Sequence, residues 1–253
     1  MATDFSKASE NAYRYCLMLA ESKPCHFLVA HVYKHHSSVN LGDDQIQTFM
    51  ESKRSEVKDR TRRFSRLYPD AVMPEIVSQC TVEVLVAEGT VSDSILQLAE
   101  KNDADVIVIG SKSHPGLLKR MFGQISSTLI YGKRFPVLIV PEDSVEVSTE
   151  RIGLLCLNSS DEERLLQWKK RTSLAIHDYR VCRIYESSLE ATEGEVIMVS
   201  DKPTNDVVQV LNSSDFHWFA ILVEDRMGEL GTERRNFIHD LYRRSRKPIL
   251  CLS

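Results

Sequence analysis

The stretch that decides the fold is the run DADVIVIG at residues 103–110, in which residues 104–109 are predicted to form a mostly apolar strand that ends at Gly110. Such a short run, rich in Val and Ile and closed by a turn residue, is typical of a strand buried on both faces. Residues 117–131 are predicted to form a helix after a short loop, and residues 136–140 read PVLIV, a second buried strand. A strand, a helix and a strand in this order predict an α/β fold, with a parallel sheet covered by helices on both faces.

The same alternation continues on both sides of this stretch. Before it, the pattern predicts helices at 6–22, 43–68 and 91–101 and strands at 26–33 and 81–87, with Ser6 as the N-cap of the first helix. After it, the pattern predicts strands at 151–157, 179–185, 195–200, 218–223 and 248–252 and helices at 161–174, 204–212 and 233–244. The second half of the chain therefore repeats the plan of the first in weaker form.

The spacing of two prolines supports this repeat. Gly110 and Pro136 are 26 positions apart, and Glu224 and Pro248 are 24 positions apart. Each interval holds a loop and a helix, and an apolar strand follows each proline. The sequence therefore predicts two copies of one α/β unit, with a first domain over residues 1–143 and a shorter, degenerate second domain over residues 150–253.

The composition of the chain excludes several classes of protein. Its 253 residues are 42% hydrophobic and 27% charged, which supports a sizeable core and argues against disorder. With a net charge of −4, the chain lacks the excess of basic residues that is typical of a nucleic-acid-binding protein. No segment approaches the ~20 apolar residues of a membrane span, and no signal peptide is evident. Six scattered cysteines without a C-x-x-C pair are typical of a reducing compartment, so we expect a cytoplasmic protein.

Several short motifs in the first half occur in the order seen in one family. They are TDFSKAS at residues 3–9, His31-Val32 at the end of a strand, Gly89 before a helix, DADVIVIG at 103–110 and FPVLIVP at 135–141. Over residues 1–141 the chain resembles the universal stress protein domain, whereas the second half resembles it only in plan and ending. The resemblance implies a tandem of two such domains, each a Rossmann-like, open, parallel, five-stranded sheet with flanking helices.

The family's fold places a central strand before the first helix, where this chain offers only residues 1–3. Omitting a central strand would expose the edges of two neighbouring strands. Two explanations stay open: further residues precede Met1 in the natural protein, or a strand of three residues suffices.

Nucleotide-binding members of the family resemble the pattern G-x-x-G, nine residues, then G-S/T. Here Gly110 and Gly123 match the first and third glycines, whereas Ser113 and Gln124 depart from the pattern. We expect the two departures to weaken nucleotide binding by roughly a hundredfold. A phosphate loop relies on unobstructed backbone N–H groups and on the hydroxyl of the Ser/Thr position, which Gln124 lacks. Gly110 and Gly123 also have structural readings, as a strand-to-helix turn and a close helix contact. The candidate residues on the phosphate side are Gly110, Ser113, Gly123, Gln124, Ile125 and Ser126.

The resemblance also implies contacts to the nucleoside. Asp4 matches the family's acidic residue after the first strand, and Thr3 and Val32 match neighbouring contacts. Asp4 has a second reading as the N-cap of the first helix, which is compatible with the first. The implied ligand of the first domain is ATP or another adenine nucleotide, with no metal of its own. We expect no nucleotide in the second domain, where Asn158 stands near the place of Asp4 and Glu224 would repel phosphate.

Three classes of function stay open. The first is a nucleotide-binding stress protein, and the second is a degenerate stress protein that acts as a protein-interaction module. The third is an enzyme, for which the sequence offers no catalytic constellation; at most we expect weak ATP hydrolysis. We expect regulatory proteins as partners. The strands at 136–140 and 248–252 are candidate edges for a homodimer or for a pseudo-dimer within one chain. The basic residues between 53 and 66 form either a solvated helix face or a docking patch for an acidic partner.

Overall fold

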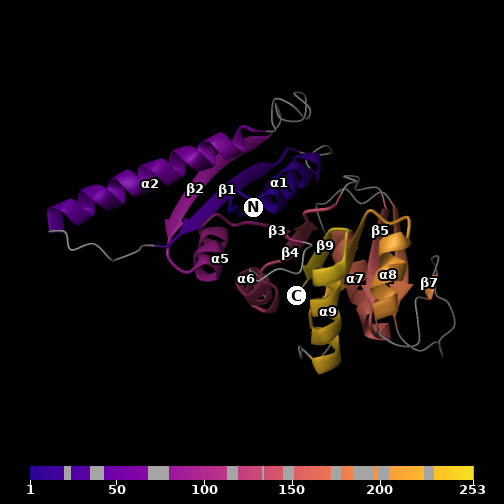
Figure 1. The fold of residues 1–253 in the computed structure, drawn as a ribbon. Coiled ribbons are helices and arrows are strands. Elements are labelled where there is room, and N and C mark those ends of the chain that lie inside the picture. The colour runs from indigo at the N-terminus through magenta and orange to yellow at the C-terminus, as the bar shows by residue number, and fades with distance from the viewer. Residues whose placement is uncertain are drawn as a thin grey trace.

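The computed structural model describes residues 1–19, 24–34, 43–67, 80–112, 119–132, 134–144, 151–171, 178–184, 197–198, 205–224 and 231–252 (Figure 1). The first half forms α1 (Lys7–Leu19), β1 (His26–Tyr33), α2 (Asp43–Ser65), β2 (Thr81–Glu88), α5 (Val91–Lys101), β3 (Ile107–Ser111), α6 (Lys119–Tyr131) and β4 (Val137–Pro141). The second half forms β5 (Arg151–Cys156), α7 (Ser159–Arg171), β6 (Asp178–Arg183), β7 (Ile197–Met198), α8 (Asn205–Ser213), β8 (Trp218–Leu222), α9 (Thr232–Arg244) and β9 (Ile249–Leu252). Strands and helices follow one another in the predicted order.

The described strands form a two-stranded sheet and a seven-stranded sheet. The smaller sheet pairs β1 with β2, and the larger has the order β3-β4-β9-β8-β5-β6-β7. Every described pair is parallel except that of β4 with β9, which is antiparallel. The last strands of the two halves therefore lie side by side, with Ile139 opposite Ile249. A parallel arrangement covered by helices was predicted and is confirmed.

The two sheets meet at the first three residues of the chain. Ala2 forms a parallel bridge with Ala30 of β1, and its N–H donates to the carbonyl of Val108 in β3 at 2.9 Å. The backbone of Met1 and Thr3 also bonds to β1, through the Ala30 N–H and the Ala30 carbonyl. Residues 1–3 therefore bond to both β1 and β3 at the place of the central strand.

The prediction of two separate five-stranded sheets is wrong in its strand counts. The larger sheet crosses from one half of the chain to the other because β4 and β9 each present an unpaired edge, and their antiparallel pairing satisfies both. The first half contributes only β3 and β4 to that sheet, and β1 and β2 join it through residues 1–3.

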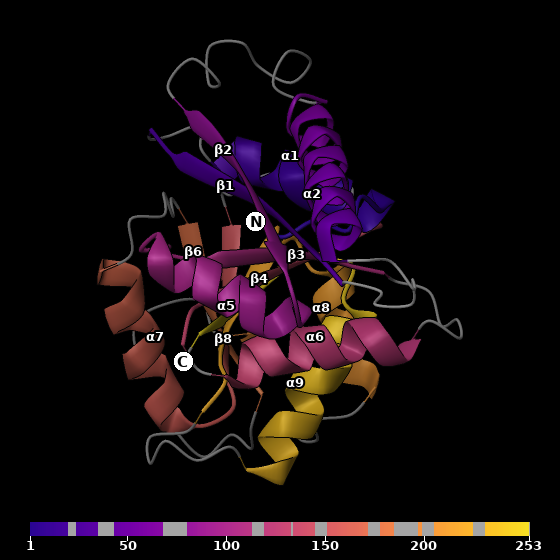
Figure 2. The ribbon, with the colours of Figure 1, turned by 90° about the vertical axis from the view of Figure 1, so that its left-hand side faces the viewer.

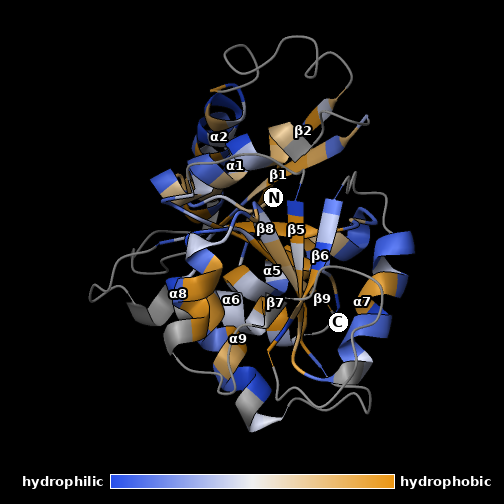
Figure 3. Ribbon diagram, turned by 90° about the vertical axis from the view of Figure 1, so that its right-hand side faces the viewer, coloured by the Kyte–Doolittle hydropathy of each residue, from blue (hydrophilic) through white to orange (hydrophobic). Residues whose placement is uncertain are grey.

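Two apolar layers enclose the strands. On one face, α5, α6, α8 and α9 pack on strands of both halves, around residues such as Ile109, Leu129 and Phe219. On the other face, α1 and α7 cover the alternate strand residues, such as Val108 and Leu154. Figure 2 shows α5 and α6 side by side, and Figure 3 shows the apolar strands β8 and β5 between α8 and α7. The first layer therefore runs through both halves without interruption.

The strand β3 begins later than predicted, because Asp103 and Ala104 form the C-terminal cap of the preceding helix, α5. The N–H of Ala104 donates to the carbonyl of Ala99 at 3.0 Å, and that of Asp103 donates to the carbonyl of Glu100 at 3.3 Å. Asp103 is left-handed, with φ of 47°. This is a Schellman cap, which ends α5 and reverses the chain. The strand therefore begins at Ile107 rather than at residue 104.

Candidate functional site

Three of the predicted site residues meet at one edge of the sheet. Ala2 lies level with Ala30 of β1 and bonds to Val108 of β3. Two residues further along each segment come Asp4, Val32 and Gly110. The carboxyl ends of neighbouring parallel strands share one edge, which is where open α/β sheets bind ligands.

The turn that follows Thr3 is held by a chain of hydroxyl groups. Thr3 is 6% exposed, and its Oγ1 donates to Ser9 Oγ at 3.0 Å and accepts the Phe5 N–H at 3.0 Å. Ser9 Oγ in turn donates to the Ser6 carbonyl at 2.9 Å. Thr3 therefore fixes the path of the chain from the central strand into α1.

Ser6, as predicted, caps the first helix. Its Oγ accepts the N–H of Ser9 at 3.3 Å, and its carbonyl accepts that of Glu10 at 2.9 Å. Asp4 is not the N-cap, and that reading is wrong. Its Oδ1 accepts the Ser6 N–H at 3.0 Å, which makes an Asx turn before the helix. Asp4 is exposed and keeps its carboxylate at the carboxyl edge of the strands.

Phe5 takes a left-handed backbone conformation, with φ of 62°. For a bulky residue this conformation costs roughly 1–2 kcal/mol, and its neighbours must offset it. Its ring stacks on His31 with centroids 4.3 Å apart, and the Arg60 guanidinium of α2 lies 4.2 Å from its centroid. The rings of Phe5 and Phe64 pack edge to face, with their centroids 5.8 Å apart. This cluster was not predicted from the sequence, because its members are distant in sequence and match no motif.

His31 carries its proton on Nδ1. That atom lies 2.7 Å from the Thr3 carbonyl oxygen, which can only accept a hydrogen bond. Burial lowers the pKa of His31, and the nearby Arg60 lowers it further, whereas the bond to Thr3 and the charge of Asp4 raise it. The imidazole is therefore neutral at pH 7 and helps to hold the turn before Asp4.

Gly110 is required by a close approach of β3 to α1. A Cβ at this position would lie 2.3 Å from the carbonyl carbon and oxygen of Ala8 and 2.6 Å from the N of Ser9. Because these are backbone atoms, no side-chain rotation would relieve the clash. Gly110 lies within β3 and does not form the predicted strand-to-helix turn, so its structural role is this close packing. That role is compatible with a ligand at the same edge.

The rest of the predicted phosphate loop is described in part. Ser113 lies outside the described residues. Gly123 and Gln124 lie inside α6, which begins at Lys119. Helix-interior N–H groups bond to carbonyls four residues earlier, so the amides that face a ligand belong to the first turn instead. In the next turn, Ile125 is half-buried against the core and Ser126 is buried.

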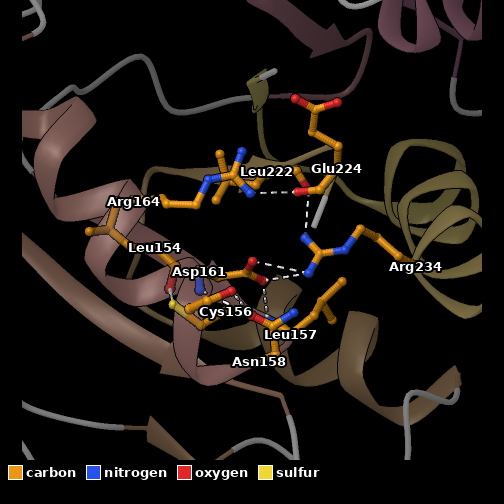
Figure 4. A network of polar contacts seen from close by, with 10 residues as sticks. Leu154, Cys156, Leu157, Asn158, Asp161, Arg164, Leu222, Glu224 and Arg234 are labelled. Atoms are coloured by element: carbon orange, nitrogen blue, oxygen red, sulfur yellow. Dashed lines mark hydrogen bonds and ion pairs between the residues drawn. The ribbon is translucent and has the colours of Figure 1, made fainter. Parts of the chain in front are cut away.

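The carboxyl edge of the second half is closed by a buried ion pair (Figure 4). Arg234 of α9 donates to both carboxylate oxygens of Asp161 in α7, at 3.0 and 2.9 Å, and to the carbonyl of Leu222 at the end of β8, at 3.0 Å. Asp161 also accepts the N–H of Leu157 at 2.9 Å. Asp161 is fully buried and Arg234 is 7% exposed. Charge-assisted hydrogen bonds of this kind fix the relative position of α7, α9 and the end of β8.

Asn158, which stands near the place of Asp4 in the predicted repeat, also forms hydrogen bonds. Its Oδ1 accepts the N–H of Asp161 at 3.1 Å and the hydroxyl of Ser160 at 2.8 Å, so it caps α7. Arg164 donates to the Glu224 carbonyl at 3.0 Å. The polar side chains at this edge thus bind one another and the strand ends. The Asp161–Arg234 pair was not predicted from the sequence. Its only signal there was an acidic residue in the first turn of one helix and an arginine in the first turn of another.

A shallow, open pocket of about 360 Å³ lies between α1 and the turn after β4. Lys7, Arg14, Glu10, Glu142 and Asp143 are among its lining residues, so its charge is mixed. Asn11 ties the turn to the helix by donating to the carbonyls of Pro141 and Ser144, at 2.8 and 3.1 Å. This arrangement positions the end of β4 and selects no particular ligand.

The described part of the chain holds neither a metal-binding cluster nor a membrane-spanning helix. No three or more His, Cys, Asp or Glu side chains there are grouped so that they could hold a metal ion. None of the described helices combines the length and the apolar character that a bilayer crossing requires.

Comparison with solved structures shows the fold of the whole chain. A universal stress protein from Archaeoglobus fulgidus DSM 4304 is similar over 100% of this chain and 94% of its own, with a TM-score of 0.67 and 16% identity. A functionally unknown protein from Pseudomonas aeruginosa PAO1 is similar over 94% of this chain and 86% of its own, with a TM-score of 0.56 and 9% identity. No curated protein matches the chain in sequence.

The sequence itself matches the model of one protein family, described as the universal stress protein family, over residues 1–141. That match covers more than half of the chain and includes the edge at which Asp4, Val32 and Gly110 meet. The chain therefore belongs to the universal stress protein family.

Proposed function

We propose that this protein is a stress-response protein whose first half binds ATP or another adenine nucleotide at the carboxyl edge of β1, residues 1–3 and β3. The observation that carries the proposal is the pairing of Ala2 with Ala30 and Val108, because this register places Asp4, Val32 and Gly110 at that edge. Asp4 offers an exposed carboxylate to ribose hydroxyls, and Val32 offers an apolar contact. Family membership supports the proposal, because nucleotide-binding members of the family resemble this chain at these positions.

The phosphates would bind at the first turn of α6. This helix follows the carboxyl end of β3, and the amides of its first turn lack partners within the helix. A helix N-terminus favours negative charge, and Gly110 precedes the loop that leads to it. In this arrangement Gly123 and Gln124 support the helix instead of contacting the phosphates.

We propose no nucleotide in the second half. A phosphate there would have to displace the Asp161–Arg234 pair, since Arg234 is already bound to a carboxylate and to a strand carbonyl. Removing one partner of such a pair would leave a buried, uncompensated charge. The expected stoichiometry is one nucleotide per chain.

A second candidate function is a protein-interaction module without nucleotide. The placement of Gly123 and Gln124 inside α6 favours it, because neither residue presents its backbone N–H to a ligand. Under this proposal the carboxyl edge of the first half is a surface for a regulatory protein.

The test is to denature the purified protein, identify the released small molecules by ion-pair chromatography, and titrate the stripped protein with ATP in a calorimeter. We expect one site per chain. Asp4→Asn should weaken binding roughly 10- to 100-fold, because a charge-assisted hydrogen bond is lost. Asp240→Asn, an exposed change on α9, is the matched control and should bind as the wild type does. No released nucleotide and no heat at millimolar ATP would reject nucleotide binding in favour of the interaction module.

A further inference from the structure

Two cysteines lie side by side at the amino ends of β1 and β2, the edge opposite the proposed nucleotide site. Cys25 precedes β1 and Cys80 precedes β2, and both are partly exposed thiols. The other four cysteines are buried. Cys25 and Cys80 therefore differ from the others in position and in access to solvent.

The strand register places the two cysteines directly opposite each other. His26 pairs with Thr81, and the Thr81 N–H donates to the Cys25 carbonyl at 3.0 Å. Cys25 directly precedes His26, and Cys80 directly precedes Thr81, so the two cysteines are level with each other. Neighbouring strands lie about 4.8 Å apart, within the roughly 4.4–6.8 Å that Cα atoms span across a disulfide. Residues level with each other on parallel strands point to the same face.

Electrostatic coupling agrees with this placement. Burial raises the pKa of the Cys25 thiol, and nearby Cys80 and Asp105 raise it further. On α1, burial raises the pKa of Tyr13, with Cys80 among the causes, and raises the pKa of Cys16 to about 11, with Cys25 among the causes. Both thiols are thus close to groups of α1, which lies on one face of the strands.

We propose that Cys25 and Cys80 are a modification site at which a peroxide converts two thiols into a disulfide. One sulfur attacks a peroxide oxygen and becomes a sulfenic acid, and one water molecule leaves. The second thiol, as thiolate, attacks that sulfur, the S–S bond forms, and the hydroxide leaves as water with the released proton. The two thiols lose two electrons, and hydrogen peroxide gains them to give two water molecules.

The disulfide would fasten the outer strand of the first half. Among the described strands, β2 pairs only with β1, and the segment between Cys25 and Cys80 contains β1 and α2. Closing a segment of this length restricts the unfolded chain. We expect the oxidised protein to melt about 10 °C higher than the reduced protein.

The test treats the full chain with hydrogen peroxide, counts thiols in denaturant, and maps disulfides by mass spectrometry without reduction. We expect the wild type to fall from six thiols to four and to yield one peptide pair joined through Cys25 and Cys80. The reaction should be faster at pH 9 than at pH 7, because the raised pKa of Cys25 keeps its thiol protonated near neutrality.

Cys80→Ala is the first variant, and Cys25→Ala repeats the test from the other side if the first variant fails to fold. In either variant the Cys25–Cys80 peptide pair must be absent and the oxidised protein must melt as the reduced protein does. The proposal is overturned if the wild type keeps six thiols, pairs other cysteines, or forms only disulfides between chains. Nucleotide binding at the opposite edge is measured separately, so neither result decides the other.

Discussion

Arg234 shows most sharply how much depends on a single side chain. It donates three hydrogen bonds, two of them to a carboxylate with no exposed surface. We expect Arg234→Ala to lower the free energy of unfolding by about 3–5 kcal/mol, because Asp161 would be left as a buried, unpaired charge. Urea unfolding followed by circular dichroism measures the change.

Arg244→Ala is the control for this experiment. Arg244 belongs to the same helix, and its ion pair with Asp240 is exposed and 3.7 Å long. Exposed pairs of this kind contribute little, so we expect a loss below about 0.5 kcal/mol. Equal losses in the two variants would contradict the role assigned to the buried pair.

His31 should make stability depend on pH in a definite direction. Its pKa in the folded protein lies below the ordinary value of 6.5, chiefly because of burial. As the pH falls through 6.5, the unfolded chain therefore binds a proton that the folded chain does not, and stability is lost. His31→Gln removes this contribution, so its unfolding free energy should fall less between pH 7.5 and 5.5 than that of the wild type. The difference is limited to about 1.4 kcal/mol per pH unit. Identical slopes for the two proteins would refute the argument.

At the scale of elements, local signals placed most helices and strands. The bounds of β1 and α5 agree with the prediction, because a β-rich run and an amphipathic pattern each end at clear turn residues. The start of β3 was predicted three residues too early. Ala104 is apolar enough for a strand, but the helix cap uses its N–H. Whether Ala104 belongs to the helix cap or to the strand depends on which carbonyl accepts its N–H, and the hydropathy of the residue carries no information on this hydrogen bond.

The candidate site residues were assigned through the family resemblance, and the strand register accounts for their placement at one edge. Residues Thr3, Asp4, Val32 and Gly110 fall at strand ends, and a parallel sheet brings strand ends together whatever the side chains are. The clusters around Phe5 and Arg234 were not predictable. Each joins side chains from three separate segments through stacking or ion pairing, which leaves no periodic trace in the sequence.

At the scale of the whole molecule, the two halves share one core layer and one sheet. We therefore expect a single cooperative unfolding transition. Ile249 of β9 is 1% exposed and pairs with Ile139 of β4. Ile249→Ala should lower the free energy of unfolding by about 2–5 kcal/mol, because it removes buried methyl groups from the shared layer.

Tryptophan fluorescence and far-ultraviolet circular dichroism together test this expectation. Both tryptophans, Trp168 and Trp218, lie in the second half, whereas circular dichroism reports on the whole chain. The two midpoints should move together in Ile249→Ala. Val210→Ala, at an exposed position of α8, should move neither by much. Two separate transitions, with only the fluorescence shifted, would show that the halves unfold independently.

By itself the sequence determined the α/β class and the order of the elements, because these follow from hydropathy patterns and turn residues that act over short distances. Only the tertiary structure decided that β4 and β9 pair, that residues 1–3 serve as a central strand, and that an ion pair closes the second edge. Each of these satisfies backbone edges or buried charges with partners far away in the chain. Which partner is within reach depends on the packing of both halves together.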